Sequence, residues 1–291
     1  MRAKAKRVFL ILILCISLVF STAVLSHAYS GILAFGDSLS DNGNADGFGV
    51  QRFSNGPVWV EYMAQNYGVS LLDMAYGGAT TGYDNPALGL SYTGLNWQVD
   101  YYLNTLHGPI SNNTLVTVWA GANDFFQGRS YATAANNVEL ALQKLAFAGF
   151  KNFLVMGLPN IGATPEFRGT SLAPLATGWS QLFNGCLAAD LQSLQLAYQG
   201  DHFYTLNTYA LLDDAIANPG KYGFDNVTGT WLTRPAGDTS NYLFWDGVHP
   251  TTQAHLMLSN YAIAAVPEPI TIFLLGLGLM GLAGIRKKIK D

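Results

Sequence analysis

Cysteine is nearly absent from this 291-residue sequence, which contains only Cys15 and Cys186. Cys15 falls in an N-terminal segment that we expect to be removed, so one cysteine remains in the rest of the chain. A single cysteine cannot form an internal disulfide. A small fold held together by disulfides is therefore excluded.

Basic residues are scarce in the middle of the chain. The two ends, residues 1–28 and 266–291, hold 8 of the 15 Lys and Arg residues but only 2 of the 19 Asp and Glu residues. Residues 29–265 therefore carry 7 basic and 17 acidic side chains, a net charge of −10. This charge argues against nucleic acid and anionic membrane surfaces as partners.

The first 28 residues have the pattern of a secretory signal peptide. Four basic residues precede an apolar run from Val8 to Phe20, and Ser26-His27-Ala28 matches a cleavage site with small residues at both ends. The apolar run is too short for a comfortable membrane span. We expect cleavage after Ala28 and export of the remaining chain.

Residues 266–291 have three parts. Val266-Pro267-Glu268-Pro269 precedes 16 mostly apolar residues, Ile270–Ile285, and then the basic Arg286-Lys287-Lys288. On physical grounds this is one hydrophobic helix with a basic cytoplasmic end, a permanent membrane anchor. The segment also resembles the PEP-CTERM sorting signal of Gram-negative bacteria. That resemblance implies removal of the helix by an exosortase, and a final place at the cell surface or in the extracellular matrix.

Strand and helix patterns alternate through residues 29–265, which predicts one α/β domain. Short apolar or β-branched runs that end at or near glycine favour about five parallel strands. Segments with helical spacing separate them, so helices should cover both faces of the sheet. The expected strands are Ile32–Phe35, Val69–Tyr76, Thr114–Trp119, Phe153–Met156 and Phe203–Leu206. The expected helices are Pro57–Tyr67, Asn96–Leu106, Tyr131–Phe147, Leu172–Tyr198 (one helix or two), Leu211–Ile216 and Thr252–Ala265.

A serine, Ser38, lies three positions after the end of the first expected strand. The stretch from Ile32 to Asn44 reads I-L-A-F-G-D-S-L-S-D-N-G-N. Open parallel sheets form their sites in the loops beyond the carboxyl ends of the strands, where Ser38 would present its hydroxyl. The alternative is an ordinary turn in which Ser38 caps a helix.

Near the other end of the domain, the loop W-D-G-V-H-P-T carries Asp246 and His249 three positions apart. A serine hydroxyl needs a base to become nucleophilic, and the base needs an orienting partner. Histidine titrates near neutrality, and a carboxylate fixes its tautomer. The alternative is a histidine at the entry of a helix whose first residue is Pro250, with Asp246 as a cap.

Two further loops could supply donors to an oxyanion. Gly77-Gly78 ends the second strand, where a backbone N–H can approach a ligand closely. Gly121-Ala122-Asn123-Asp124 ends the third strand and brings the Asn123 amide to the same edge. With the Ser38 N–H these groups would make a three-donor oxyanion hole. Alternatively, Asn123 is a turn residue and Gly78 a plain chain reversal.

The blocks G-D-S-L-S, G-G, G-A-N-D and D-G-V-H-P occur in an order and spacing that resemble the GDSL (SGNH) serine hydrolase family. The block R-F-S-N-G-P-V-W, residues 52–59, extends the resemblance to a branch with lipases, esterases and acyltransferases. The resemblance implies a flavodoxin-like three-layer α/β/α sandwich. It implies Ser38 as nucleophile, His249 as base and Asp246 as orienting residue, with an oxyanion hole of Ser38 N–H, Gly78 N–H and Asn123 amide. Because the second block reads A-Y-G-G-A-T, Gly77 is an alternative donor to Gly78.

These roles describe an exported hydrolase that cleaves a lipid, a short acyl ester or an acetylated polysaccharide through an acyl-Ser38 intermediate. The mechanism needs no metal ion and no organic cofactor. One alternative is an acyltransferase that uses the same intermediate. Another is a non-catalytic surface or matrix protein that keeps the fold as a binding module. Loop aromatics either line an acyl or sugar pocket or belong to the ordinary core and rim: Tyr83, Tyr92, Trp97, Phe125 and Phe126.

Overall fold

The computed structural model describes residues 29–49, 52–107, 109–234 and 241–266. The expected signal peptide, residues 1–28, and the expected hydrophobic helix, Ile270–Ile285, lie outside the described residues. Within the described ranges, no helix is both long enough and apolar enough to cross a membrane.

Five parallel strands form the central sheet in the order β2-β1-β3-β4-β5. This is the strand order of flavodoxin-like sheets, in which the crevice for ligands opens between β1 and β3. The predicted α/β class with about five parallel strands is confirmed. The strands are β1 (Gly31–Gly36), β2 (Ser70–Asp73), β3 (Thr114–Trp119), β4 (Asn152–Met156) and β5 (His202–Leu206).

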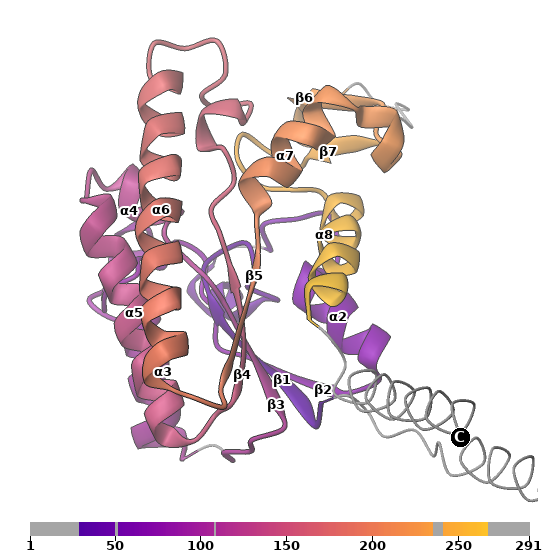
Figure 1. The fold of residues 1–291 in the computed structure, drawn as a ribbon. Coiled ribbons are helices and arrows are strands. Elements are labelled where there is room, and N and C mark those ends of the chain that lie inside the picture. Colours follow the sequence, from indigo (N-terminus) through magenta and orange to yellow (C-terminus); the bar gives the residue numbers. More distant parts are fainter. Residues whose placement is uncertain (1–28, 50–51, 108, 235–240, 267–291) are drawn as a thin grey trace, which may run out of the picture. The chain divides into compact units, whose positions relative to one another are not determined.

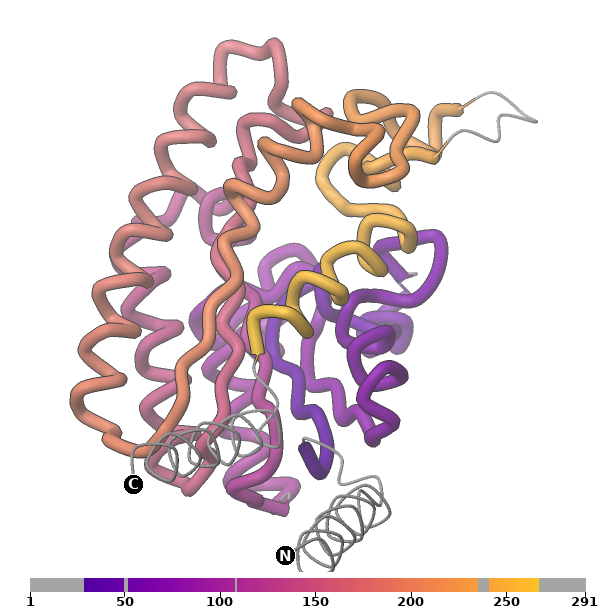
Figure 2. The backbone as a smooth tube through the Cα atoms, turned by 45° about the vertical axis from the view of Figure 1, so that its right-hand side comes forward, coloured from indigo at the N-terminus to yellow at the C-terminus, as the bar shows by residue number. Residues whose placement is uncertain are grey.

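Helices cover both faces of this sheet and complete three layers (Figure 1). On one face α2 (Trp59–Tyr67) packs along α8 (Thr252–Ala265), the yellow helix that runs beside it in Figure 2. The other face holds α3 (Leu95–Tyr101), α5 (Tyr131–Ala148) and α6 (Ala173–Ala197), and α6 is one helix rather than two. Shorter helical pieces are α4 (Ala122–Phe126), a π-helix (Tyr102–Leu106) and 3₁₀ turns at Asn44–Phe48, Pro86–Leu88, Ile161–Ala163, Pro219–Tyr222 and Trp231–Thr233.

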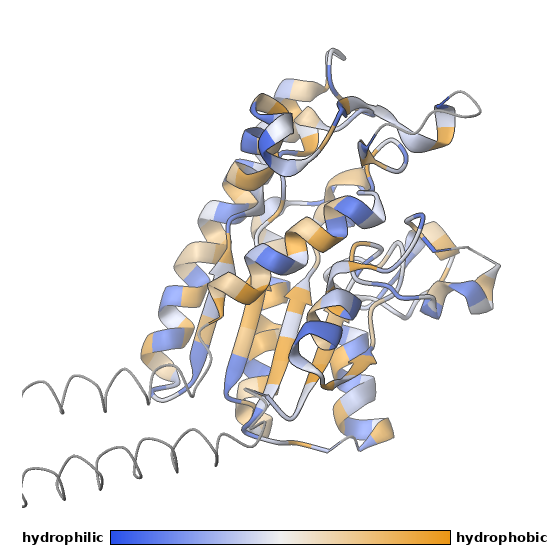
Figure 3. Ribbon diagram, turned by 90° about the vertical axis from the view of Figure 1, so that its right-hand side faces the viewer, coloured by the Kyte–Doolittle hydropathy of each residue, from blue (hydrophilic) through white to orange (hydrophobic). Residues whose placement is uncertain are grey.

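The core lies on both faces of the sheet, which explains why its strands read as near-continuous apolar runs. Every residue of β4 is buried, and so are all but the first residues of β1 and β3. Figure 3 shows the strands of the sheet largely in orange, whereas the helices that flank them mix orange with blue. The layer arrangement therefore fixes the loops at the carboxyl edge on a rigid base.

A second, two-stranded parallel sheet was not predicted. It consists of β6 (Asn226–Thr230) and β7 (Tyr242–Phe244) and lies near α7 (Thr208–Ala217), beyond the carboxyl end of β5 (Figure 1). These elements share a small apolar cluster with α8, made of Ala215, Phe224, Val227, Leu243, Phe244 and Ala254. The sequence of β6, N-V-T-G-T, is too polar to predict a strand.

Several predicted boundaries differ from those in the structure, among them the start of α7, which lies at Thr208 instead of Leu211, and side chains explain two of the differences. Helix α2 begins at Trp59 rather than Pro57. The Glu61 carboxylate accepts the Val58 N–H, which makes Val58 the N-cap of the helix. Helix α8 has the expected bounds, Thr252–Ala265, but Pro250 is not its first residue, because the Thr251 hydroxyl accepts the Ala254 N–H as an N-cap. Strand β2 stops at Asp73 instead of reaching Tyr76, since its carboxylate accepts the N–H of Ala75 and turns the chain.

Candidate active site

Three loops meet at the carboxyl edge of the sheet, one after each of its first three strands. They bring Ser38 from β1, Gly78 from β2 and Asn123 from β3 to the wall of one cavity. His249 lines the same cavity and comes from the loop between β7 and α8. We call this space of about 340 Å³ the first cavity.

Ser38, His249 and Asp246 form an unbroken hydrogen-bonded path. The Nε2 atom of His249 lies 2.8 Å from Ser38 Oγ, and its Nδ1 atom lies 2.7 Å from Asp246 Oδ2. Because an ionised carboxylate only accepts hydrogen bonds, Nδ1 carries the proton. With Nδ1 as the donor to Asp246, Nε2 is the nitrogen that can accept the Ser38 hydroxyl hydrogen and remove it.

The other oxygen of Asp246 fixes the loop that carries His249. Asp246 Oδ1 accepts the backbone N–H groups of Val248 at 2.9 Å and His249 at 2.8 Å. Burial raises the pKa of Asp246, but hydrogen bonding and attraction from His249, together with these N–H groups, outweigh it, so the net pKa is lowered. Asp246 is therefore ionised under neutral conditions and orients His249 at both the ring and the backbone.

Only one of the two adjacent glycines has an N–H left for a ligand. Gly77 donates its N–H to Asp41 Oδ2 at 2.7 Å. Within the described ranges no acceptor is found for the Gly78 N–H or for the Ser38 N–H. Gly78 also has φ +80°, and a Cβ there would meet Ala87 at 2.5 Å. A side chain is therefore excluded at Gly78, a residue that lines the first cavity.

Asn123 keeps one amide hydrogen for the cavity because only one is used elsewhere. Its Nδ2 donates to the carbonyl of Ala79 at 3.0 Å, next to Gly78. The neighbouring Asp124 accepts both the N–H and the hydroxyl of Thr81, at 2.8 and 3.0 Å. These bonds hold the loop after β2 against the loop after β3. The Gly78 N–H and the Asn123 amide are therefore held at a fixed distance from each other.

Phe53 supports the ring of His249 and was not identified from the sequence as a site residue. The two ring centroids are 4.9 Å apart and the planes are tilted by 39°. Phe53 also lies so close to Gly77 that a Cβ there would be 2.0 Å from the Phe53 ring. The aromatic ring therefore fills the space between the imidazole and the glycine turn.

Asp41 is a second residue that the sequence interpretation missed. Its Oδ1 accepts the N–H groups of Gly43 and Asn44, at 2.8 and 2.6 Å. Its Oδ2 accepts those of Ala45 at 3.2 Å and Gly77 at 2.7 Å. Burial raises the pKa of Asp41, and these donors oppose the shift. The carboxylate thus joins the loop after β1 to the glycine turn after β2. A second aspartate in G-D-S-L-S-D was the available signal.

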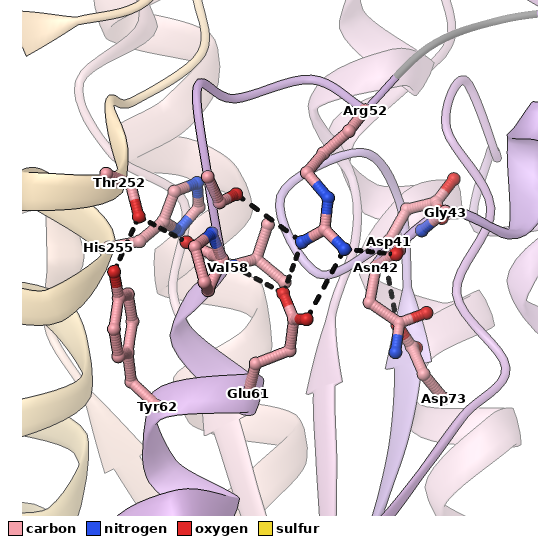
Figure 4. A network of polar contacts seen from close by, with 12 residues as sticks. Asp41, Asn42, Gly43, Arg52, Val58, Glu61, Tyr62, Asp73, Thr252 and His255 are labelled. Carbon is pink, nitrogen blue, oxygen red and sulfur yellow. Dashed lines mark hydrogen bonds and ion pairs between the residues drawn. The ribbon is translucent and has the colours of Figure 1, made fainter.

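Arg52 extends this network toward α2 (Figure 4). Its guanidinium donates to the backbone carbonyl of Asn42 and to the carboxylate of Glu61. Glu61 in turn accepts the Val58 N–H at 2.7 Å. On the other side of α2, Thr252 accepts or donates a hydrogen bond with Tyr62 at 2.6 Å (Figure 4). Helix α2 therefore connects the loop that carries Ser38 with the helix that follows His249.

Asp37 is fully buried beside Ser38. Burial raises its pKa to about 7, and the N–H of Leu39, which donates to Oδ1 at 3.1 Å, offsets this only in part. The Oδ2 atom has no hydrogen-bond partner in the described part of the chain. A carboxyl with a pKa near 7 in such a place is uncommon and carries a cost for folding when ionised.

The loop aromatics separate into two groups. Of the five considered from the sequence, Phe126 lines the first cavity. The other four do not line it: Trp97 stacks on Tyr101 with centroids 4.6 Å apart, and Phe125 packs with Phe126 itself in an aromatic cluster. Among the residues that the structure describes, no group of three His, Cys, Asp or Glu side chains is placed to hold a metal ion.

Comparison with known families gives two matches in this chain. The family model described as GDSL-like Lipase/Acylhydrolase matches residues 32–262. The model described as PEP-CTERM protein-sorting motif matches residues 265–288. The first match covers most of the chain and includes every candidate site residue named above.

Two curated relatives are similar over most of this chain. A thermolabile hemolysin of Vibrio parahaemolyticus is 28% identical over 259 residues, which cover 77% of this chain and 60% of the hemolysin. A phosphatidylcholine-sterol acyltransferase of Aeromonas hydrophila is 24% identical over 332 residues, which cover 88% of this chain and 96% of that protein. This chain thus spans less than two thirds of the hemolysin.

One solved structure supports the fold. A member of the lipolytic protein G-D-S-L family from Veillonella parvula superposes with a TM-score of 0.51 and 15% sequence identity. The superposition covers 80% of this chain and 96% of that one. The three-layer arrangement is therefore shared.

Proposed function

The chain belongs to the GDSL-like lipase/acylhydrolase family, and on that premise we propose that it cleaves carboxylic esters through an acyl intermediate on Ser38. The observation that carries the proposal is the path from Asp246 through His249 to Ser38, with distances of 2.7 and 2.8 Å. Ser38 is the proposed nucleophile, His249 the base and Asp246 the orienting carboxylate.

In the first half of the reaction, Ser38 Oγ attacks the ester carbonyl carbon as its proton passes to His249 Nε2. The tetrahedral intermediate collapses when its C–O bond to the alcohol breaks, and His249 gives the proton to the leaving alkoxide. The acyl group stays on Ser38. Asp246 stabilises the imidazolium that exists between these two transfers.

The proposed oxyanion hole consists of the Ser38 N–H, the Gly78 N–H and the second amide hydrogen of Asn123. Each of these donors lines the first cavity or belongs to a residue that does. Because they are held before the substrate arrives, they stabilise the negative charge without reorganisation. Gly78 is preferred to Gly77 since the Gly77 N–H is bound to Asp41.

In the second half, His249 takes a proton from an incoming hydroxyl compound whose oxygen attacks the acyl carbon. The bond between that carbon and Ser38 Oγ then breaks, and His249 returns the proton to Ser38. Water gives hydrolysis, and an alcohol gives acyl transfer. The similarity to the Aeromonas acyltransferase favours keeping acyl transfer as a second candidate. An added alcohol acceptor separates the two, because acyl transfer produces a new ester and hydrolysis a free acid.

We also propose an order for the whole chain: signal peptide at residues 1–28, hydrolase domain at 29–265 and sorting segment at 266–291. The match to the PEP-CTERM motif supports export to the surface of a Gram-negative bacterium and processing by an exosortase. The mass of the mature protein tests the processing. A mass that still includes residues 270–291 would contradict it and would indicate a permanent membrane anchor.

The nucleophile is tested with the full-length protein, its Ser38→Ala variant and a Ser193→Ala control at an exposed serine of α6. We expect hydrolysis of nitrophenyl esters by the first and third proteins and only background rates for Ser38→Ala. A fluorophosphonate should form an adduct that requires Ser38. Equal rates in all three folded proteins, with no adduct, would contradict the proposal and favour the binding-module interpretation.

A further inference from the structure

A second cavity of about 50 Å³ lies next to the first. The two cavities share four lining residues, Leu39, Pro159, Thr164 and Val248. A residue that lines both spaces stands at their boundary. Leu39 follows the proposed nucleophile and Val248 precedes the proposed base, so this boundary lies beside the reacting atoms.

The boundary between the cavities is apolar. Leu39, Pro159 and Val248 carry no polar side-chain atom. The remaining member, Thr164, donates its hydroxyl to the Ile161 carbonyl at 2.8 Å. Its hydroxyl hydrogen is thus engaged within the protein. A hydrocarbon chain that starts at Ser38 would cross this boundary without displacing a polar contact, whereas a sugar hydroxyl would find on these side chains only the lone pairs of the Thr164 hydroxyl oxygen.

The walls of the second cavity are mostly apolar and come chiefly from three elements. Trp119 of β3 also lines it, and its Nε1 has no hydrogen-bond partner in the described part of the chain. Helix α7 supplies Leu211 and Leu212, strand β7 supplies Leu243 and Phe244, and helix α8 supplies Ala254, Met257 and Leu258. Thr208, at the start of α7, donates its hydroxyl to the Gly157 carbonyl. Several of these side chains belong to the apolar cluster beneath the two-stranded sheet. The cavity is therefore an extension of that cluster toward Ser38.

We propose that the second cavity holds the distal methylene groups of the acyl chain, so that the enzyme prefers esters of fatty acids to acetyl esters. This inference rests on the proposed function, since it places an acyl group on Ser38. An acetyl group has no methylene and cannot extend beyond the first cavity. Each additional methylene that leaves water for an apolar wall raises binding about fourfold.

The test measures kcat/KM of the full-length protein for nitrophenyl esters from acetyl to dodecanoyl. We expect kcat/KM to rise about fourfold per methylene until the second cavity is full and then to level off. The Ala254→Leu variant adds three carbon atoms to a wall residue that is 1% exposed. In this variant the ratio of kcat/KM for dodecanoyl to that for acetyl should fall about tenfold or more, since at least two methylenes lose their place.

Two further variants make the test independent of folding defects at Ala254. Leu212→Phe fills the same cavity from α7 and should lower the same ratio, while Met257→Ala enlarges it and should move the plateau to longer chains. Leu256→Phe, at an exposed position of α8, is the matched control and should leave the ratio unchanged.

The possible outcomes distinguish this inference from the proposed function. If the unmodified protein hydrolysed esters no faster than Ser38→Ala, the proposed function itself would be overturned. Ser38-dependent hydrolysis with the highest kcat/KM for acetyl esters, and with ratios unaffected by Ala254→Leu and Leu212→Phe, would overturn only the acyl-chain site. That second result would favour an acetylated carbohydrate as substrate.

Discussion

Asp41 Oδ2 accepts the Gly77 N–H at 2.7 Å, so a side chain three positions after Ser38 holds the turn that carries Gly78. This bond spans the loops after β1 and β2, which contain the proposed nucleophile and one proposed oxyanion donor. Asp41 contacts neither substrate nor reacting atoms in the proposed mechanism. We therefore regard it as a positioning residue, and the first prediction concerns it.

Asp41→Asn should lower kcat by about 10- to 100-fold and change KM less than twofold. The amide has one acceptor oxygen, so it cannot accept all four N–H groups that the carboxylate holds. We expect the Gly78 donor to shift as a result, and the loss in kcat to be a part of the roughly 10²–10³-fold loss caused by removal of an oxyanion donor. Steady-state kinetics below the melting temperature of the variant provide the measurement. A rise in KM with kcat unchanged would show that Asp41 does not act through the oxyanion hole.

Asn123→Ala should lower kcat by roughly 10²–10³-fold, because it removes one proposed oxyanion donor. The variant also loses the bond to the Ala79 carbonyl, so the melting temperature must be measured beside the kinetics. Asn104→Ala, at an exposed position, is the control and should match the unmodified protein. A kcat within threefold of the unmodified value in folded Asn123→Ala would remove Asn123 from the proposed site.

Asp37 should make the free energy of unfolding fall as the pH rises from about 4 to about 7. Its carboxyl has a pKa raised by burial to about 7 in the folded protein, against about 3.9 in an unfolded chain. Between these values the folded state holds a proton that the unfolded state has released, so deprotonation favours unfolding. Above pH 7 the loss is complete and the contribution becomes constant.

Asp37→Asn tests this because it removes the titrating group. The free energy of unfolding of the variant, relative to the unmodified protein, should increase between pH 5 and pH 8 in urea titrations. His249, Asp124 and Asp41 also act on the charge of Asp37, and each is unchanged in the variant. Asp46→Asn, at an exposed position, is the control. A difference that is the same at both pH values would contradict the prediction.

The ion pair of Arg52 and Glu61 should contribute more to stability than a surface pair. Both side chains are partly buried, with 29% and 26% of their surface exposed, and Arg52 also binds the Asn42 and Gly56 carbonyls. A double-mutant cycle with Arg52→Ala and Glu61→Ala should give a coupling free energy of about 1–2 kcal/mol. The cycle for Arg129 and Asp84, a more exposed pair, supplies the comparison. Equal couplings would contradict the prediction.

The elements of the main sheet were predictable because each strand combines an apolar run with a glycine or a turn at its end. Strand β3, expected at Thr114–Trp119, has those bounds. Helix starts were less predictable, since a proline suits a first turn but does not require one. After Pro250, the start of α8 is set by the next residue, Thr251, whose hydroxyl caps the helix. Pro250 pairs with Phe244 instead.

The residues brought together at the first cavity could be predicted from the sequence, because a nucleophile, a base and oxyanion donors each need a particular kind of side chain or N–H group. The residues that hold them in position could not be predicted. Asp41, Asp124 and Phe53 act through contacts between loops that lie far apart in the sequence, such as Asp124 with Thr81. The small sheet was missed for a related reason. Its strands are short, and β6 gains its place from packing under α7 rather than from its own polar sequence.

The bond between Ser38 and His249 joins residues 211 positions apart in the chain. Contacts of such long range form only after the intervening segments are in place, which makes them slow to form. A nascent chain that has exposed Ser38 but still lacks the loop with His249 does not yet contain the partner of this hydroxyl. In the proposed mechanism, the serine therefore stays chemically ordinary until the loop with His249 is in place, whatever esters surround the chain during its synthesis. Turnover of an ester is thus also a report that folding is complete.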